Sequence, residues 1–397
     1  MNRIVFGLLL ALIAISSVVQ WSVALKFGHD SWQLTEWLIN YQGGFVRRGL
    51  SGELFHALAH LTGIRATRLV VVFSYVVYVV FSILFYRMAK NAFHPVFIVS
   101  CFVLAFPACQ DSIVRKDCFL LLCFLTSLRL LRLAKPTTLA MVQASLISVI
   151  AVLIHEAYVF FALPAFVVFT WPLSSGTTAH FKNRGIVIGG LLLSGFIVAA
   201  LNHGDVETAR RVNISWFPLW QSTNPESELI CQPAAAIQAI GWTPEKGLSL
   251  GLDLLTSGLY QPLAWLMLFT TSFFLVIAFS LNLVCEDCPN GRLIGILLVQ
   301  FAAISPLFLL GFDYGRWLFF WLASSMILHA NGASPPAWLN KIGRAMLENS
   351  HFHFLLASLQ QRAWVLLFIG VPVCWNTREF LLSCPIVRFL HLAGFHH

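Results

Sequence analysis

The sequence predicts an all-α fold: a polytopic transmembrane helical bundle of about eleven spans that forms one integral membrane domain over residues 1–397. Hydrophobic residues make up 58% of the chain and charged residues only 11%, whereas a soluble domain carries roughly 25% charged residues. Apolar runs are spread along the whole length, and the many Phe and Trp residues are typical of lipid-facing helices with aromatic belts. The composition therefore excludes an ordinary soluble enzyme. We assign the formal charge of +8 to the Lys and Arg bias of membrane topology, not to nucleic acid.

A helix that crosses a membrane needs ~20 mostly apolar residues. The runs that approach this length are residues 4–25, 69–87, 93–109, 117–134, 138–154, 157–171, 185–201, 262–284, 292–312, 315–331 and 363–376. The first run is long for a signal peptide and is followed by no small-residue cleavage site, so we expect it to be retained as a span.

Charge asymmetry orients the predicted bundle. With a cytoplasmic N-terminus, the loops on the inner side hold most of the scattered Lys and Arg residues and only the acids Glu286, Asp287 and Glu348. This distribution favours a multi-pass membrane protein whose inner side is cytoplasmic. On the outer side we expect two large loops, residues 26–68 with a surface-lying helix near 51–61 and residues 202–261 above the bundle.

Four short charged clusters fall on the predicted outer side, each beside the end of an apolar run. They are Gly43-Gly44-Phe45-Val46-Arg47-Arg48-Gly49, Arg115-Lys116-Asp117, His155-Glu156 and Asp313-Tyr314-Gly315-Arg316-Trp317. Charge at a membrane border is tolerated only where water, a partner or a ligand satisfies it, so such residues are functional candidates. Their common side predicts one shared polar site.

The basic members of these clusters are candidates for binding an anionic substrate, because guanidinium groups suit phosphate and carboxylate oxygens. The predicted substrate-binding residues are Arg47, Arg48, Arg115, Lys116, Asp313, Arg316 and Trp317. Each has a simpler alternative. The arginine pair at 47–48 would also suit lipid headgroups, Arg115-Lys116-Asp117 would serve as a helix cap and interfacial anchor, and Asp313 would also suit a local pair with Arg316.

The candidate catalytic residues are Glu156, His155 and Asp117, which would accept the proton of an acceptor hydroxyl. Glu156 has no polar flank beyond His155, so it should face a cavity, water or a cation. The alternative is a solvated His-Glu pair in a tight hairpin. Asp30 and Glu36 in the first outer loop would suit a metal, an acceptor hydroxyl or a plain surface role equally well.

No resident cofactor and no metal site is predicted. Cys285 and Cys288 have the spacing of half a zinc site, but no second pair of ligands is visible in the sequence. The chain has no P-loop, Rossmann glycine motif or nucleophile elbow, so ATP-driven and NAD-linked roles lack support. A divalent cation is left open by the acids of the first outer loop.

The combination of motifs resembles the bacterial polysaccharide polymerases of the Wzy and EpsG type, within the multi-spanning glycosyltransferases that use polyprenyl-linked donors. Arg115-Lys116-Asp117 at the start of a span, His155-Glu156 after the next inner loop and Asp313-x-x-Arg316 in a late outer hairpin carry the resemblance. It implies glycan transfer from an undecaprenyl-diphosphate-linked saccharide on the periplasmic face. It also implies partners in glycan export and chain-length control, as in O-antigen and exopolysaccharide biosynthesis.

Two other classes of function are compatible with the sequence. A transporter or flippase for an anionic lipid or solute would need ionisable residues at mid-membrane and access from both faces, whereas the charges here lie at one border. A non-catalytic scaffold that binds phosphate-bearing lipids would keep the basic cluster and tolerate the loss of Glu156 and Asp117.

Overall fold

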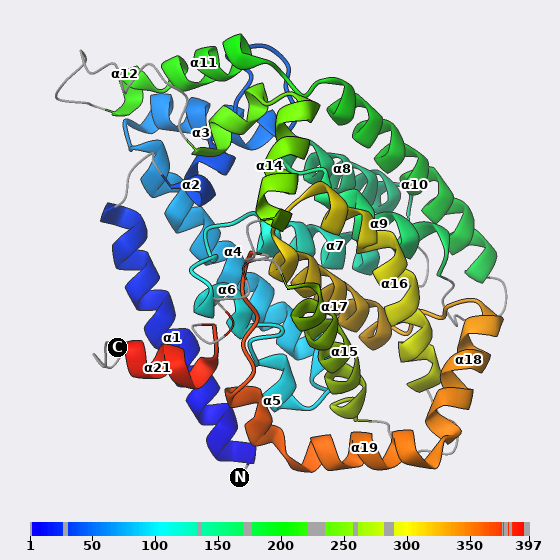
Figure 1. The fold of residues 1–397 in the computed structure, drawn as a ribbon. Coiled ribbons are helices and arrows are strands. Elements are labelled where there is room, and N and C mark those ends of the chain that lie inside the picture. The colour runs from blue at the N-terminus through cyan, green and yellow to red at the C-terminus, as the bar shows by residue number, and fades with distance from the viewer. Residues whose placement is uncertain are drawn as a thin grey trace.

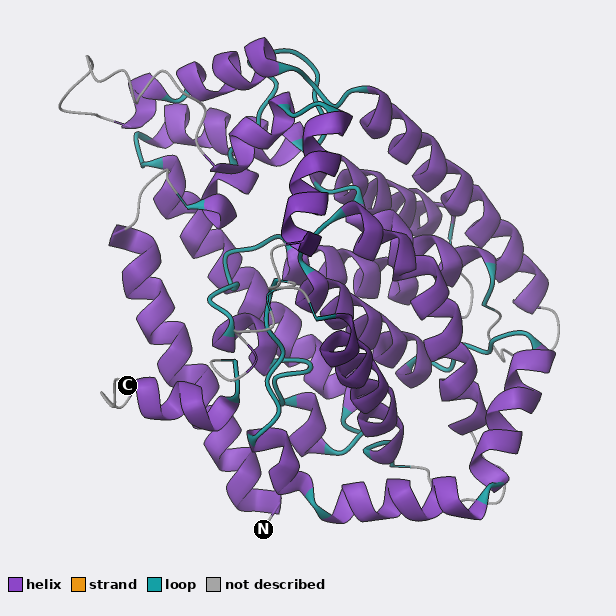
Figure 2. Cartoon of the chain, in the orientation of Figure 1, coloured by secondary structure: helices purple, strands orange, loops and turns teal. Residues whose placement is uncertain are grey.

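The part of the protein that the computed structural model describes consists of helices joined by loops and turns (Figure 2). That part comprises residues 2–26, 31–132, 137–169, 177–220, 235–256, 261–281, 290–374, 376, 380 and 383–392. Within these residues the structure has no strand, and an isolated antiparallel bridge joins Phe93 to Ser280. The predicted all-α class is confirmed.

The helices alternate between long apolar rods and short connecting segments (Figure 1). In chain order they are α1 (Asn2–Lys26), α2 (Trp32–Trp37), α3 (Gly49–Thr62), α4 (Ala66–Ala89), α5 (Pro95–Ile98), α6 (Ala105–Cys109), α7 (Asp117–Leu131), α8 (Thr138–Ile154), α9 (Ala157–Val167), α10 (Thr177–Leu201), α11 (Val206–Ser215), α12 (Phe217–Trp220), α13 (Ala235–Gln238), η2 (Ala239–Gly241), α14 (Pro244–Thr256), α15 (Pro262–Ala278), α16 (Asn290–Leu310), α17 (Tyr314–Ala330), α18 (Ala337–Glu348), α19 (Ser350–Gln361), η3 (Ala363–Leu367) and α21 (Pro385–Leu392).

Four of these helices contain a stretch that is long and apolar enough to cross a membrane. The stretches are Asn2–Ala24, Ala66–Ala89, Asn183–Leu201 and Gly291–Leu310. Large apolar side chains are exposed along them, with Ile4 at 68% and Leu309 at 90% exposure, as expected of surfaces that meet lipid instead of water. The chain is therefore a membrane-associated helical protein.

Helix α17 forms the centre of the bundle and is buried from Gly315 to His329. It packs against α16, α7, α4 and α9, and Trp321 Nε1 donates to the carbonyl of Leu297 on α16 at 2.8 Å. Gly315 passes so close to the 370–374 segment that a Cβ there would lie 1.8 Å from the carbonyl oxygen of Pro372. The start of α17 is thus packed tightly against the backbone of the 370–374 segment.

Two of the expected spans are not continuous helices. Residues 93–109 divide into α5, α6 and intervening turns, and residues 363–376 begin with η3 and then leave helical geometry in the described part. Burial among other helices, not lipid exposure, explains the apolar character of the first segment, because most residues from 96 to 109 are buried. The number of continuous helical spans is therefore lower than the apolar runs suggest.

The broken segment and the turn after it have backbone carbonyls that side chains from other elements satisfy. Trp37 Nε1 donates to Val114 O at 2.5 Å, and Tyr78 Oη donates to Leu104 O at 2.8 Å. Gln20 on α1 donates to the carbonyl of Ala108. Non-helical backbone inside a membrane protein is tolerated where such partners replace water.

The two large loops predicted for the outer side gather at one end of the bundle (Figure 1). The surface helix expected near 51–61 is α3, with Leu54 and Leu61 exposed. Helices α11 and α13 from the second loop pack near α2, and Trp216 Nε1 donates to Leu38 O at 2.9 Å. Together α2, α3, α11 and α13 form a cap over this end, while α18 and α19 lie at the other end.

Helix lengths create a recess beneath this cap. Helix α7 begins beside Ser74, whose hydroxyl lies 3.3 Å from Val114 O. Ser74 is roughly two turns, or ~12 Å, inside α4 from its start at Ala66. The start of α7 therefore lies below the start of α4, and the ends of α8, α9 and α17 that carry the other charged clusters meet it at this depth. This position is called the recess below.

Candidate functional site

The four predicted clusters meet at one place in the structure. Ten side chains lie together there and are here called the ion cluster: Glu36, Arg47, Arg48, Arg115, Lys116, Asp117, His155, Glu156, Asp313 and Arg316. Nine of them connect through salt bridges, and Lys116, which donates to the backbone carbonyl of Ile154, is buried beside them. Arg47 and Arg48 precede α3, Asp117 starts α7, His155 and Glu156 separate α8 from α9, and Arg316 lies in the first turn of α17. The recess is where these helix ends coincide.

Glu36 on the short helix α2 lies at the centre of the ion cluster. Its carboxylate is 1% exposed, and its Oε1 lies 3.0 Å from His155 Nε2, 3.8 Å from Arg48 Nη1 and 4.0 Å from Arg316 Nη2. Its other oxygen, Oε2, has no hydrogen-bond partner among the residues that the structure describes. Glu36 is therefore a buried carboxylate with one anchored and one free oxygen.

Arg48 holds Glu156 through two nitrogens. Its Nε lies 2.8 Å from Oε2 and its Nη2 contacts Oε1, while Arg47 Nη1 is 3.8 Å from Oε1. Arg48 takes a left-handed backbone conformation, with φ of 66°, at the N-terminal boundary of α3. Residues other than glycine rarely adopt that conformation and it costs of order 1–3 kcal/mol, so the paired guanidinium and the surrounding packing hold Arg48 there.

Arg316 joins two carboxylates on the other side of Glu36. Its Nε is 2.9 Å from Asp117 Oδ2 and its Nη2 is 2.6 Å from Asp117 Oδ1. Its Nη1 donates to Asp313 Oδ2 at 2.6 Å, and Arg115 Nη1 reaches the same oxygen at 3.1 Å. Asp313 therefore bridges Arg316 to Arg115 at the edge of the ion cluster.

Lys116 is fully buried and has a backbone partner: its Nζ donates to Ile154 O at 3.0 Å and lies 5.5 Å from the centre of the Trp37 ring. Burial lowers the pKa of Lys116 to about 7, because the attraction of Glu36 and Glu156 only partly offsets desolvation. Lys116 is thus the basic group of the cluster that changes its charge near neutral pH.

The carboxylates that face the recess are ionised at neutral pH. Burial alone would raise the pKa of Glu36, but Arg316, His155 and Lys116 outweigh it and hold that pKa well below 4.5. The pKa of Glu156 is held well below 4.5 in the same way, against burial, chiefly by Arg48. Burial also lowers the pKa of His155 below 6.5, so the imidazole is neutral at pH 7.

Because of these pairings, the basic side chains do not form an open group of positive charges. The cluster contains five basic groups (Arg47, Arg48, Arg115, Lys116, Arg316) and four carboxylates (Glu36, Asp117, Glu156, Asp313), so its net charge is about +1 when Lys116 is protonated and about zero otherwise. Arg48 and Arg316 already hold carboxylates through two nitrogens each. Arg47, with 35% of its side chain exposed, is the most accessible cation of the cluster.

The glycines beside Arg47 and Arg48 serve chain packing. A Cβ on Gly49 would lie 2.2 Å from the Tyr41 ring, and one on Gly52 would lie 2.0 Å from Ile39 O. They let the 38–52 turn fold onto itself, which accounts for their number without a bound ligand. Phe45 stacks on Tyr41 with ring centres 5.2 Å apart and is half exposed.

Trp317 is buried below the cluster and offers no exposed face for a sugar. Its ring stacks on Phe320 at 6.0 Å, and the Arg316 guanidinium carbon lies 5.3 Å from its centre. The exposed Tyr41–Phe45 pair is therefore the better placed aromatic surface near Arg47 and Arg48.

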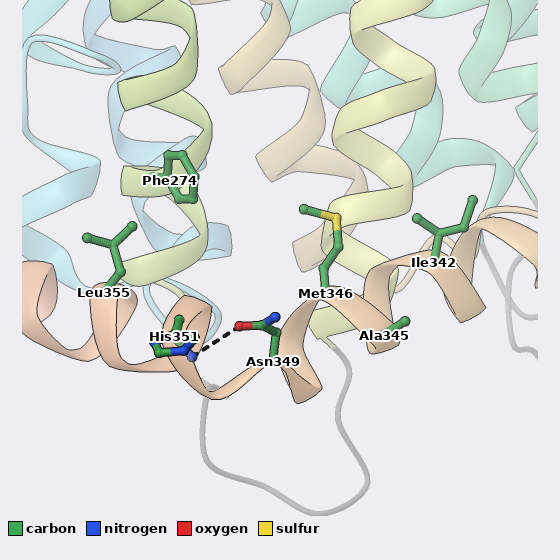
Figure 3. A pocket seen from close by; sticks show the side chains of 7 residues that line it. All are labelled: Phe274, Ile342, Ala345, Met346, Asn349, His351 and Leu355. Carbon is green, nitrogen blue, oxygen red and sulfur yellow. Dashed lines mark hydrogen bonds between the residues drawn. The ribbon is translucent and has the colours of Figure 1, made fainter.

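The described residues line two cavities that bear on the location of the site. One of about 350 Å³ adjoins the ion cluster and is lined in part by Gln110, Asp111, Arg115, Cys374 and Arg388. The other, of about 650 Å³, lies at the opposite end between α15, α18 and α19 (Figure 3). Its lining is mostly apolar, with Asn349 and His351 as its polar members, and includes no carboxylate, Lys or Arg, so it lacks the permanently charged groups that the ion cluster has.

Within the described ranges, no group of three or more His, Cys, Asp or Glu side chains is arranged to hold a metal ion. Cys285, Cys288 and Asp30 lie outside those ranges. Two features of the site were not predicted from the sequence: the central position of Glu36, and the pair formed by Arg388 and Asp111 at 2.5 Å. The sequence signal that could have found Glu36 is an acid placed between the apolar residues Leu34 and Trp37. The structure shows that both of these neighbours are buried.

The fold and the site together define a helical membrane-associated protein with a recessed, nearly charge-balanced ion cluster at one end. No family model matches the chain, and neither the curated proteins nor the solved structures include a match.

Proposed function

We propose that the protein is a membrane glycosyltransferase or glycan polymerase that transfers glycan from a polyprenyl-diphosphate-linked donor. The observation that carries the proposal is the convergence of basic and acidic side chains in one recess next to Glu36, a buried carboxylate with a free oxygen. Transfer from a lipid diphosphate requires cations near the leaving group and a proton acceptor near the incoming hydroxyl. No nucleotide site is needed, because the lipid-linked donor is already activated.

The proposed reaction forms one bond and breaks one. The hydroxyl oxygen of the acceptor attacks the anomeric carbon of the donor sugar, and the bond from that carbon to the diphosphate oxygen breaks. The electron pair of that bond stays on the lipid diphosphate, and the hydroxyl proton passes to a carboxylate. Arg47 and Arg115, whose pairing is the least complete, would meet the diphosphate first.

Glu36 is the proposed proton acceptor. Both oxygens of Glu156 and of Asp117 are held by a guanidinium, whereas Glu36 Oε2 is free and Oε1 is anchored by His155. An incoming diphosphate would compete with Glu36 for Arg48 and Arg316, so the pKa of Glu36 would rise as the donor binds. The base would then gain strength only in the loaded site.

The proposal places the recess on the outer face of a bacterial inner membrane, with the N-terminus in the cytoplasm. The support is the charge of the loops on the opposite side, whose Lys and Arg residues are accompanied by only three acids, Glu286, Asp287 and Glu348. The arrangement is polytopic, and the two broken segments bring the number of helical crossings below about eleven. Glycan-export and chain-length proteins are the expected partners.

The test is complementation of a deletion strain with Glu36→Gln, followed by analysis of long-chain glycan and of lipid-linked saccharide. Loss of a general base costs roughly 10²–10⁴-fold in rate, so long-chain glycan should disappear while the lipid-linked saccharide accumulates. Glu207→Gln is the matched control, because Glu207 is exposed on α11, away from the ion cluster. Normal glycan length and yield from Glu36→Gln at wild-type protein levels would exclude Glu36 as the base.

Alanine variants of Arg47, Arg48, Arg115 and Arg316, made one at a time, test the cationic side of the site. Undisturbed glycan in all four, with expression verified, would exclude the transferase proposal. Retained glycan in Glu36→Gln, Glu156→Gln and Asp117→Asn together with loss in the arginine variants would instead favour a lipid-binding scaffold or a transporter.

A further inference from the structure

The cavity of about 350 Å³ beside Arg115 has no assigned role in the reaction described above. It lies between the 109–115 turn, the 373–374 segment and α21. Gln20, at a depth of ~9 Å from the end of α1, donates to Ala108 O just before this turn. The cavity is therefore at the same end of the bundle as the ion cluster, next to α1.

Three buried donors in the cavity lining lack partners. Gln110 Nε2, Arg115 Nε and Arg388 Nε are shielded from solvent and have no hydrogen-bond partner among the described residues. Arg115 is only 7% exposed. An unsatisfied buried donor costs about 1–3 kcal/mol, and more when it is charged, so a ligand rich in acceptor oxygens would gain from all three.

The same lining contributes no unpartnered buried acceptor atom within the part of the chain described. Each arginine uses another nitrogen for a carboxylate: Arg115 Nη1 binds Asp313, and Arg388 Nη2 binds Asp111 at 2.5 Å. Asp111 also lines the cavity, and its charge is paired with Arg388. The unpartnered buried atoms of the lining are thus all donors, which suit an anion.

Lipid-facing surfaces flank the cavity. Helix α21, which carries Arg388, exposes Ile386, Phe389 and Leu390, and it packs against α1. Leu392 of α21 packs against the cluster that contains Leu12 of α1, and α1 exposes Leu10 and Ile15 next to it. An anionic group that entered from this side would be the head of a molecule with a long apolar tail.

We propose that the cavity formed by Gln110, Arg115 and Arg388 is a phosphoryl-binding subsite for the head of a lipid phosphate. The anion site follows from the three donors, and only the identification of the lipid as a polyprenyl phosphate rests on the proposed function. Asp313 links Arg115 to Arg316, so a phosphoryl group in the cavity contacts the ion cluster through Arg115 and lies one carboxylate away from Arg316. The subsite would hold the lipid phosphate while its sugar reaches the recess.

The test is binding of undecaprenyl phosphate to the purified full-length protein in nanodiscs, measured by native mass spectrometry. Arg388→Gln and Gln110→Leu should each weaken binding by roughly tenfold, and polyprenol without phosphate should bind more weakly than the phosphate ester. Arg210→Gln is the control, because Arg210 is an exposed arginine on α11. Gln110→Leu keeps the test valid if Arg388→Gln fails to fold, since it removes a donor without changing the charge.

Wild-type affinity in both cavity variants, or equal binding of polyprenol and undecaprenyl phosphate, would overturn the proposal. Inorganic phosphate that binds as tightly as the lipid phosphate would overturn its lipid part and leave a site for free phosphate. Failure of the proposed function would look different: Glu36→Gln would retain transfer, whereas binding at the cavity would still depend on Gln110 and Arg388.

Discussion

Breaking the ion pair between Asp117 and Arg316 should lower the free energy of unfolding more than breaking any exposed ion pair. Two nitrogens of Arg316 bind the two oxygens of Asp117 at 2.9 and 2.6 Å, and the side chains are 3% and 4% exposed. Breaking such a buried pair typically costs 3–5 kcal/mol, because a charge stays behind without its partner. Asp313 still neutralises part of Arg316, so we expect Asp117→Asn to cost about 3 kcal/mol.

The pairing itself can be measured with a double-mutant cycle. The variants are Asp117→Asn, Arg316→Met and their combination, and the free energy of unfolding is followed in mixed micelles of rising SDS fraction. The double variant should cost less than the sum of the single ones by about 2 kcal/mol, within the range for residues in direct contact. Glu207 and Arg211 on α11 give the matched control: their pair is 3.0 Å long but more than half exposed, so its coupling should be about 0.3–0.5 kcal/mol.

Additive costs for Asp117 and Arg316, within about 0.5 kcal/mol, would refute the reasoning. The two groups would then not share a buried salt bridge, and the ion cluster would lose the link between α7 and α17. A coupling as small as that of the α11 pair would have the same meaning.

Three further changes test other parts of the structure. Lys116 has a pKa of about 7 in the folded protein against 10.5 for a free lysine, so between these values the unfolded chain binds more protons and the free energy of unfolding should rise with pH. Lys116→Met should remove this rise, and an unchanged rise in that variant would contradict the burial of Lys116. Gly315→Ala would place a Cβ 1.8 Å from Pro372 O and should lower stability by about 1–3 kcal/mol in a thermal melt, whereas Gly7→Ala, where no atom lies within 4 Å, should not; equal melting temperatures would contradict the packing at the start of α17. Arg47→Ala should cost less than about 1 kcal/mol of stability, because Arg47 is 35% exposed and 3.8 Å from its carboxylate, but should lower the yield of long-chain glycan in the complementation assay, and an unchanged yield would remove Arg47 from contact with the diphosphate.

The meeting of the charged clusters could be predicted because alternate crossings return the chain to the same side of a membrane. Arg47, Arg115, Glu156 and Arg316 stand at the ends of apolar runs, and a polar residue at such an end has few places to go in lipid. The number of crossings between these residues is therefore enough to predict that they lie at a common end. The all-α class followed from composition in the same way.

Which charges pair could not be predicted. Arg48 with Glu156 and Arg316 with Asp117 are separated by 108 and 199 positions, and no local pattern encodes such a partner. Glu36 occupies the centre because α2 turns into the recess, which depends on packing against α4 and α13. A buried carboxylate and a solvated one have the same sequence signature.

The broken 93–109 segment shows a further limit of hydropathy. Its residues are apolar because protein surrounds them, with Phe97, Val103 and Phe106 buried to 1% exposure or less. An apolar run of this length is compatible with a span, a buried core element or a re-entrant segment. Burial by neighbouring helices decides between these, and hydropathy does not report it.

The carbonyls of that segment and of the turn after it have a consequence for how the chain assembles. Ala108, Leu104 and Val114 depend on donors from Gln20, Tyr78 and Trp37, which belong to three earlier elements. Such donors replace the water that hydrocarbon lacks, so the segment can settle only after α1, α2 and α4 stand together. The N-terminal quarter of the protein thus acts as a template for the turn that delivers Arg115 and Lys116 to their places, and errors in its insertion would appear as a misplaced ion cluster.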